Sequence, residues 1–519
     1  MKKRLFSVLV VVVLLAGIIT AALLNIPFKD ISPEEASSSV SLASEATYDK
    51  ETIYLWYSDD TLTNYLTSAA VEYSEKNKVR VMPQLEPSAE FFETINKAAV
   101  ESNVPDLYIT SHDNLGKAYM AGLTQPILMT PEEFDQTYIS QAKNSVTYKD
   151  SLLGYPLSYE TSVLLYNETY LKDMAISALT AQKDEEATAD NEGADDNSSA
   201  ATESKYEFTD DEIAQKIQEL IPVTVNGITD LGNGFDAPEG VESFMTWDVT
   251  DIFYNYFFLG DAINIGGDSG WDSSQIDIYN ENAIKSFSAY QELNQFFSID
   301  TSNSQYSQII SDFMEGKIVL TIATSDAIST LDKAIEDGTF KYDYGVAMVP
   351  DINEELDTRS MSVTNCAVIN PFSTKQEVAN DFAKFLTTEY AVNLYQKSGK
   401  ASPAVCVNYD DVPAFNVFAM EYGYSYPLPK MMETSNLWVI LEGAFADIWD
   451  GDDPNQKLKE VAEQINFQLT GEQEELEYIE IKEETEDVEY YDEEELMRQA
   501  QQENQDTQAS PAPSDNGAQ

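Results

Sequence analysis

The chain has 519 residues, 43% of them hydrophobic, which is enough apolar material for one large or two ordinary domains. Its formal net charge is -61, and a surface this acidic lacks the clustered Lys and Arg that nucleic acids and anionic membrane faces require. With His112 as the single histidine and no CxxC, HExxH, GxSxG or Walker sequence, His-rich metal sites are excluded and the common motif-bearing enzyme classes have no basis.

An apolar stretch without charges, Leu5–Phe28, follows the basic residues at the N-terminus. As a helix it would be about 36 Å long, enough to span a bilayer, and the basic start places the rest of the chain outside the cell. Signal peptides have shorter apolar cores, and Thr20-Ala21-Ala22 is a poor cleavage site. We expect residues 1–28 to anchor the protein on the extracellular face of the cell membrane. A cleaved signal and secretion are the alternative.

Ordered sequence is expected to begin after a linker at residues 29–50 that is rich in Ser, Ala and Glu. Strands and helices then alternate, which is typical of a mostly parallel α/β sheet. The expected strands are Ile53–Tyr57, Val79–Met82 and Leu107–Thr110, and the expected helices are Leu62–Lys76 and Phe91–Glu101.

The segment Pro105–Leu123 is the most informative of these. It predicts a short buried strand, a polar loop that contains Asp113, and a helix closed by Gly122. In open α/β sheets, ligands bind at the carboxyl ends of the strands, where Asp113 lies. The alternative is that Asp113 caps the helix, and we interpret His112 as a loop residue beside it.

Further along the chain, residues from about 180 to 205 contain almost nothing to bury, and we expect a disordered insertion there. The residues from 471 to 519 are dominated by acidic and polar side chains and predict a solvated tail. Cys366 and Cys406 could pair outside the cell, but their spacing does not decide it. Helices are expected at Asp211–Leu220, Trp247–Leu259, Asn282–Phe297 and Gln308–Met314.

Seven segments, taken in order, resemble those of extracellular solute-binding proteins of the maltose-binding class, the receptor components of ABC importers. They are Ile53–Asp60, Pro105–Leu123, Gly154–Asn167, Phe313–Ile322, Tyr344–Pro350, Ala367–Phe385 and Met431–Ile448. The resemblance implies a type II fold of two α/β lobes joined by a multi-strand hinge, with the ligand trapped between them. It implies a monomer without enzyme activity, cofactor, metal or nucleic acid, which passes a small solute to ABC permease subunits.

The resemblance also implies domain boundaries. Lobe 1 would comprise residues 51–158 and 367–412, and lobe 2 would comprise residues 159–366 and 413–470. The chain would cross between the lobes in Tyr155–Ser162 and again near Thr364–Ile369.

Four cleft residues carry over from the family by position: Asp60, Asp113, Glu160 and Trp438. Carboxylates accept hydrogen bonds from sugar hydroxyls, and an indole covers the apolar face of a pyranose ring. Each has an alternative, because Asp60 and Asp113 could cap helices, Glu160 could brace the hinge, and Trp438 could belong to the core.

Departures from the family pattern leave the ligand open. Thr110 and Asn114 replace a Trp and an Arg of the maltose binder, and Asp326 replaces its second stacking Trp. Tyr254, in a cluster with Trp247 and Tyr256, could substitute as a stacking surface, although its spacing also suits a helix packed inward. We therefore add Asp326 and Tyr254 to the ligand-binding candidates. A sugar leads, a short peptide or an amine remains possible, and the carboxylates favour neutral or cationic ligands.

Two other functions compete with transport. The expected anchor and acidic tail would also suit a surface sensor or scaffold on the same fold. An extracellular hydrolase would need two carboxylates roughly 5 to 9.5 Å apart across a glycosidic bond, a separation that Asp113 and Glu160 could meet only by accident.

Overall fold

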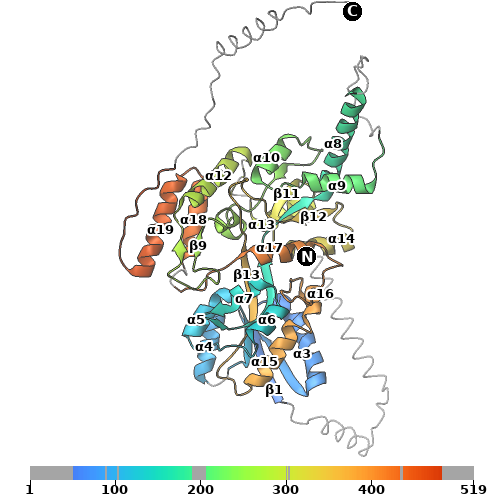
Figure 1. The fold of residues 1–519 in the computed structure, drawn as a ribbon. Coiled ribbons are helices and arrows are strands. Elements are labelled where there is room, and N and C mark those ends of the chain that lie inside the picture. The colour runs from blue at the N-terminus through green and yellow to red at the C-terminus, as the bar shows by residue number, and fades with distance from the viewer. Residues whose placement is uncertain are drawn as a thin grey trace, which may run out of the picture. The chain divides into compact units, whose positions relative to one another are not determined.

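The computed structural model describes residues 51–87, 90–101, 104–189, 206–297, 299, 301, 304–432 and 436–481. The predicted anchor, the linker and the acidic tail beyond residue 481 lie outside these residues. The chain divides into two units, residues 1–474 and 475–519, and the described part of the second unit contains no helix or strand. Two lobes make up the described part of the first unit, each built around its own sheet (Figure 1).

Lobe 1 contains a six-stranded sheet in the order β14-β13-β3-β1-β2, with β6 beside β13. β1 runs parallel to β2 and β3, whereas β13 runs antiparallel to β3 and β6. The strands of lobe 1 are β1 (Glu51–Tyr57), β2 (Val79–Leu85), β3 (Leu107–Ser111), β4 (Thr147–Tyr148), β5 (Ser151–Leu152), β6 (Tyr155–Thr161), β13 (Met361–Ile369) and β14 (Tyr426–Pro427). Its helices are η1 (Asp60–Leu62), α3 (Thr63–Asn77), α4 (Phe91–Glu101), η3 (His112–Asn114), α5 (Leu115–Met120), α6 (Pro131–Thr137), α7 (Ser140–Val146), α15 (Gln376–Thr387), η5 (Ala391–Asn393), α16 (Leu394–Ser398) and α17 (Ala414–Tyr424).

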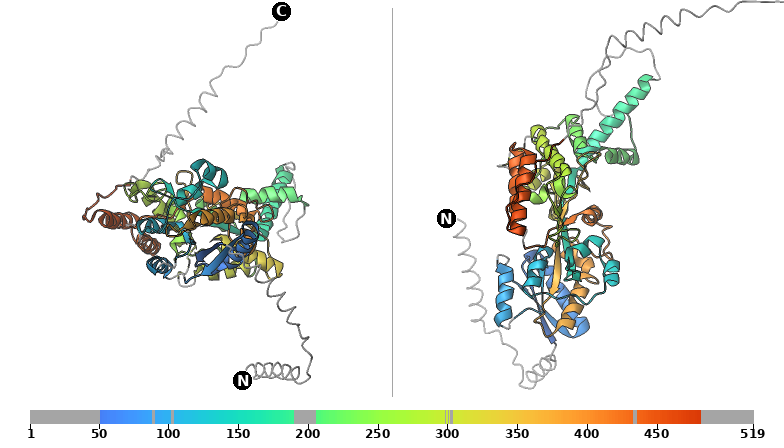
Figure 2. Two further views of the ribbon diagram at one scale, coloured as in Figure 1. Left: turned by 90° about the horizontal axis from the view of Figure 1, so that it is seen from below. Right: turned by 60° about the vertical axis from the view of Figure 1, so that its left-hand side comes forward.

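Helices cover both faces of this sheet, which accounts for its apolar strands. α3 and α15 pack together on one face, with the rings of Tyr73 and Phe382 5.0 Å apart, and α4 and α5 lie on the other face (Figures 1 and 2). Leu55 and Leu107, in the centre of the sheet, are fully buried. Gly122 has a φ of +68°, which suits the glycine expected just after the end of α5.

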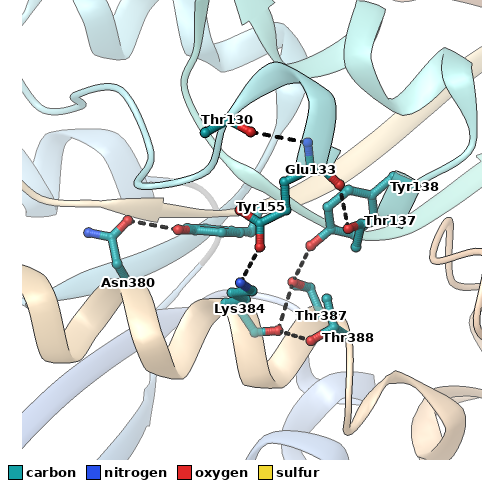
Figure 3. A network of polar contacts seen from close by, with 9 residues as sticks. All are labelled: Thr130, Glu133, Thr137, Tyr138, Tyr155, Asn380, Lys384, Thr387 and Thr388. Carbon is teal, nitrogen blue, oxygen red and sulfur yellow. Dashed lines mark hydrogen bonds and ion pairs between the residues drawn. The ribbon is translucent and has the colours of Figure 1, made fainter. Parts of the chain in front are cut away.

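A polar network fixes α15 against α6 and against the first residue of β6 (Figure 3). The hydroxyl of Tyr155 donates to Asn380 Oδ1 at 2.9 Å. Lys384 forms an ion pair with Glu133, and the hydroxyls of Tyr138 and Thr387 lie 2.7 Å apart. β6 therefore starts from a rigid part of lobe 1 before it crosses toward lobe 2.

Lobe 2 contains a four-stranded sheet in the order β12-β7-β11-β8, in which β7 and β11 are fully buried. Its strands are β7 (Val163–Asn167), β8 (Ser243–Met245), β9 (Asn264–Ile265), β10 (Ile276–Asp277), β11 (Ile318–Ala323) and β12 (Tyr344–Ala347). Its helices are α8 (Glu168–Ala189), α9 (Asp210–Leu220), α10 (Val225–Asn233), η4 (Ile252–Tyr254), α11 (Phe257–Gly260), α12 (Glu281–Phe297), α13 (Tyr306–Met314), α14 (Ser325–Glu336), α18 (Leu437–Trp449) and α19 (Pro454–Thr470). α9 lies alongside α8, which extends away from the sheet (Figures 1 and 2).

Three segments connect the lobes. β6 leads into β7 through Ser162, residues 348–360 lead from β12 to β13, and residues 428–432 lead out of β14 toward α18. β6 and β13 pair with each other along most of their length. Because side chains alternate along a strand, Glu160 and Asn365 are partly accessible on one face, whereas Tyr159 and Thr364 are buried on the other.

Three sequence-based expectations differ from the structure. Residues 180–189, expected to be disordered, continue α8, and only residues 190–205 of the expected insertion lie outside the described residues. Trp247–Leu259 is not one helix, because the only helical parts are η4 and the first turn of α11. The lobe boundaries also differ: β13 joins the lobe 1 sheet from Met361 on, earlier than the expected boundary at residue 367, and β14, expected in lobe 2 with residues 413–470, pairs with β13 in the lobe 1 sheet.

The two cysteines do not pair. Cys366 is buried in β13, where its thiol donates to the carbonyl of Thr110, and Cys406 is exposed. The disulfide that the sequence left open is therefore not formed.

Candidate functional site: a pocket at the strand ends of lobe 1

A pocket of about 320 Å³ lies where β1 and β3 end. This is the edge of a parallel sheet at which α/β proteins bind ligands. Its lining is mostly polar, with an aromatic wall from the start of α4, and every lining residue belongs to lobe 1. The lining residues are Ser58, Asp59, Leu62, Glu90, Phe91, Phe92, Glu93, Ile109, Thr110, Ser111, Asn114, Lys117 and Asn365.

Asp59 supplies the carboxylate on the β1 side of the pocket. It is the N-cap of η1 and accepts hydrogen bonds from the backbone and the hydroxyl of Thr61 at 3.0 and 2.6 Å. Lys400 lies 3.0 Å away as an ion partner. Burial alone would raise the pKa of Asp59, but the bonds from Thr61 and the charge of Lys400 hold it below its ordinary value. Asp59 is therefore a fixed, ionised acceptor at neutral pH.

The rest of the lining combines aromatic rings with hydrogen-bond donors. Phe91 and Phe92 are almost fully buried, and the ammonium of Lys117 lies 5.5 Å from the centre of the Phe92 ring. Asn114 donates to the hydroxyl of Ser111 at 2.9 Å. A few placed polar groups beside an aromatic wall are the usual composition of a small-molecule site.

Glu160, on β6, makes two bonds to lobe 2. Its carboxylate accepts from the backbone N–H of Ser325 at 2.7 Å and from the Ser325 hydroxyl at 2.8 Å. The N-cap of α14, Thr324, makes no side-chain capping bond of its own, so Glu160 caps this helix from lobe 1. Burial raises the pKa of Glu160 to about 7, with the Ser325 bonds opposing the shift. These contacts favour the hinge brace over a free ligand acceptor.

Tyr254 and Asp326 meet in a second cluster, on lobe 2. Tyr254 stacks on Tyr306 with ring centres 4.5 Å apart. The Tyr306 hydroxyl donates to Asp326 at 2.9 Å, and Thr324 also contacts this carboxylate. Because Asp326 follows Ser325, this cluster adjoins the Glu160 cap. The structure therefore brings together three of the six candidates, Glu160, Asp326 and Tyr254.

The other three candidates lie elsewhere. Asp60 is exposed in the first turn of η1, next to the pocket residue Asp59 but not part of the lining. Asp113 lies in η3 without capping it, is absent from the pocket lining, and has a buried Oδ1 without a partner. Trp438 is half-buried at the start of α18, with its ring 6.0 Å from that of Tyr256.

His112 and Lys430 form a buried cluster with Asp113. His112 Nδ1 accepts from the backbone of Thr364, so its Nε2 carries the proton and donates to the Leu428 carbonyl. Lys430 donates to the Asn144 carbonyl, and burial lowers its pKa to about 7. Both ring nitrogens of His112 are engaged by backbone, so it has no free base for catalysis. Among the residues that the structure describes, no group of three or more His, Cys, Asp or Glu could hold a metal ion.

Sequence reasoning missed Asp59, the Phe91–Phe92 pair and Asn365. Asp59 carries a usable signal, because an Asp two residues before a Thr, at the start of a helix, suits an N-cap better than Asp60 does. The Phe pair was assigned only to a helix. Asn365 reaches the pocket because β13 pairs with β3, and no pattern in the sequence around Asn365 indicates that pairing.

Comparison with known proteins places these features in a family. The family model of bacterial extracellular solute-binding proteins matches residues 68–405. A galactooligosaccharide-binding protein of Bacillus subtilis (strain 168) is 23% identical over 446 residues, which cover 84% of this chain and 93% of that protein.

Solved structures show the same fold. An extracellular solute-binding protein from Staphylococcus aureus in complex with maltose superposes with a TM-score of 0.63 at 18% identity, covering 82% of this chain and 99% of that one. A cyclo/maltodextrin-binding protein with maltotetraose gives a TM-score of 0.64 at 17% identity, covering 83% and 100%. The expected two-lobe type II fold is thereby confirmed. No helix within the described ranges is long and apolar enough to cross a membrane.

Proposed function

The chain belongs to the family of bacterial extracellular solute-binding proteins, and from this premise we propose that it captures an oligosaccharide outside the cell and delivers it to an ABC permease. The observation that carries the proposal is the lobe 1 pocket at the strand ends, whose lining combines the ionised Asp59 with the aromatic side chains of Phe91 and Phe92. Such a pocket suits sugar hydroxyls and the apolar face of a pyranose ring.

The galactooligosaccharide-binding relative and the maltose-bound neighbours support a neutral sugar as the ligand. The pocket itself supports this choice, because Asp59, Glu90 and Glu93 outnumber Lys117 among its charged residues. An acidic sugar would meet repulsion there. On this proposal the protein is not an enzyme, and closure of lobe 2 brings the Asp326 and Tyr254 cluster over the bound sugar. Asp60, Asp113, Glu160 and Trp438 stay predictions for ligand contact.

Titration calorimetry of the full chain with β-1,4-galactotriose, maltotriose and a galacturonate trimer tests the proposal. We expect one of the neutral sugars to bind and the acidic trimer not to bind. Failure of both neutral sugars, or binding of the galacturonate trimer alone, would contradict it.

A matched pair of variants locates the site. Asp59→Asn keeps the N-cap but removes the charge that accepts sugar hydroxyls, and we expect at least about tenfold weaker binding. Asp60→Asn changes the neighbouring exposed carboxylate and should bind as the parent does. The reverse result would return the site to the residue that the sequence indicated.

Membrane anchoring by residues 1–28 is part of the proposal, because the charge-free stretch is long and its cleavage site poor. N-terminal sequencing of the native protein tests it, and a mature start between residues 23 and 39 would replace anchoring with secretion. A sensor or scaffold without transport is not favoured by any feature of the described residues.

A further inference from the structure

Asp332, on α14, accepts hydrogen bonds from two tyrosines that belong to different lobes. Its Oδ1 accepts from the hydroxyl of Tyr344 at 2.8 Å, and its Oδ2 accepts from the hydroxyl of Tyr395. Tyr344 lies on β12 of lobe 2, as Asp332 does, whereas Tyr395 lies on α16 of lobe 1. A single carboxylate therefore makes one bond within its lobe and one between the lobes.

The interlobe bond lies outside the three connecting segments. The ring of Tyr395 packs against Phe415 with centres 4.6 Å apart, which fixes the direction of its hydroxyl. α16 also approaches α14 closely at Gly399, where an added Cβ would lie 2.8 Å from the hydroxyl of Ser329. Burial and the Asp332 charge raise the pKa of both tyrosines, so both hydroxyls keep their protons and donate.

Every residue that lines the pocket belongs to lobe 1. We take this arrangement, in which lobe 2 contributes nothing to the lining, as the open one. Closing two lobes around a ligand moves them as nearly rigid bodies about the hinge. Such a rotation shifts α14 relative to α16 and strains the Tyr395 bond, whereas the Tyr344 bond moves along with lobe 2.

We propose that Tyr395 and Asp332 form an interlobe clasp that stabilises the open arrangement and thereby sets ligand affinity from outside the pocket. The inference rests on the proposed function, since it assumes that ligand capture requires closure. Tyr395 is a positioning residue, because it affects ligand binding through the arrangement of the two lobes. A ligand that binds the closed form must break the clasp, and the free energy needed to break it lowers the apparent affinity for that ligand.

The expected effect follows from the kind of bond. A hydrogen bond to an ionised carboxylate is stronger than a neutral one, and Tyr395→Phe removes it while the ring stays packed on Phe415. We expect the Kd of the Tyr395→Phe variant for β-1,4-galactotriose to fall about tenfold, which corresponds to about 1.4 kcal/mol. Tyr344→Phe is the matched control, because it removes a bond to the same carboxylate within one lobe. Its Kd should stay within about twofold of that of the parent.

The experiment measures Kd by calorimetry and backbone hydrogen exchange by mass spectrometry on the full-length parent and both variants. Without ligand, Tyr395→Phe should slow exchange in the pocket segment at residues 107–117, because lobe 2 covers it more of the time. Tyr344→Phe should leave exchange there unchanged. A role in stability alone would lower the melting temperature of both variants and change neither readout.

Two results would overturn the clasp: equal Kd and equal pocket exchange for the two variants, or weaker binding by Tyr395→Phe. If the parent binds no sugar, the proposed function fails, and the exchange difference between the ligand-free variants still decides whether the clasp holds the lobes apart.

Discussion

Glu160 offers the sharpest test of the hinge, because its carboxylate joins the two lobes and titrates near neutrality. Burial raises its pKa from 4.5 to about 7. Between these two values the folded protein keeps a proton on Glu160 that the unfolded chain has released. Stability must therefore fall as the pH rises through this window. A shift of this size corresponds to at most about 3 kcal/mol, at about 1.36 kcal/mol for each pKa unit.

Glu160→Gln imitates the protonated acid, and its amide can still accept from the backbone of Ser325. We expect the free energies of unfolding of parent and variant to differ least at pH 5, near the pKa of the unfolded chain. At pH 8 the variant should be more stable by up to about 3 kcal/mol, because only the parent buries a charge there. Glu421 is also buried, with a pKa raised to about 7, but it is present in both proteins and cancels in the difference.

Urea denaturation followed by tryptophan fluorescence, at pH 5, 6, 7 and 8, measures this difference. Asp60→Asn is the control, because that side chain is exposed and the difference from the parent should not change with pH. A constant difference between parent and Glu160→Gln at all four pH values would refute the reasoning, since Glu160 would then titrate alike in both states.

Two further predictions test the packing around the site. If the indole covers the ligand, Trp438→Ala should weaken sugar binding about thirtyfold, as measured by calorimetry. If Trp438 instead belongs to the core beside Tyr256, the variant should lose about 3 to 5 kcal/mol of stability in urea denaturation, with an unchanged Kd. Gly116→Ala should lower stability by about 1 to 3 kcal/mol in the same denaturation assay, because its Cβ would lie 2.1 Å from the Lys430 carbonyl oxygen. Gly443→Ala is the control: a Cβ there would meet nothing within 4 Å, so its stability should be unchanged or slightly higher. Equal effects of the two glycine substitutions would contradict the close approach at Gly116.

The helices and strands of lobe 1 could be predicted because each is encoded by the spacing of apolar residues within its own segment. The expected helix Phe91–Glu101 has the same bounds in the structure, and the expected strand Leu107–Thr110 is one residue shorter than β3. The expected helix at Trp247–Leu259 failed for the opposite reason. Trp247 is buried by donating to Asn255 and packing on Trp449, a residue far along the chain, so its burial does not depend on helical spacing.

The lining of the candidate pocket was harder to predict than the fold, because a shift of one residue along a turn changes the side to which a side chain points. Asp60 and Asp59 are neighbours, yet only Asp59 lines the pocket. Ser111 and Asn114 line it as well, while Asp113 between them points to a buried environment near Lys430 and Cys366. A resemblance assigns positions along the sequence, and the turn geometry that selects among adjacent carboxylates appears only in three dimensions.

α14 connects these observations. Side chains of lobe 1 form hydrogen bonds to it at two positions, Glu160 at Ser325 and Tyr395 at Asp332, which lie two helical turns apart. Asp326, the ligand candidate on the same helix, lies next to the first of these points. A helix of this length moves as a rigid rod, so a ligand that pulled on Asp326 would act on both contacts at once. The pH dependence of Glu160 and the affinity change at Tyr395 should therefore be coupled. The double variant Glu160→Gln/Tyr395→Phe should deviate from additivity in Kd, and strict additivity would mean that the two contacts open independently.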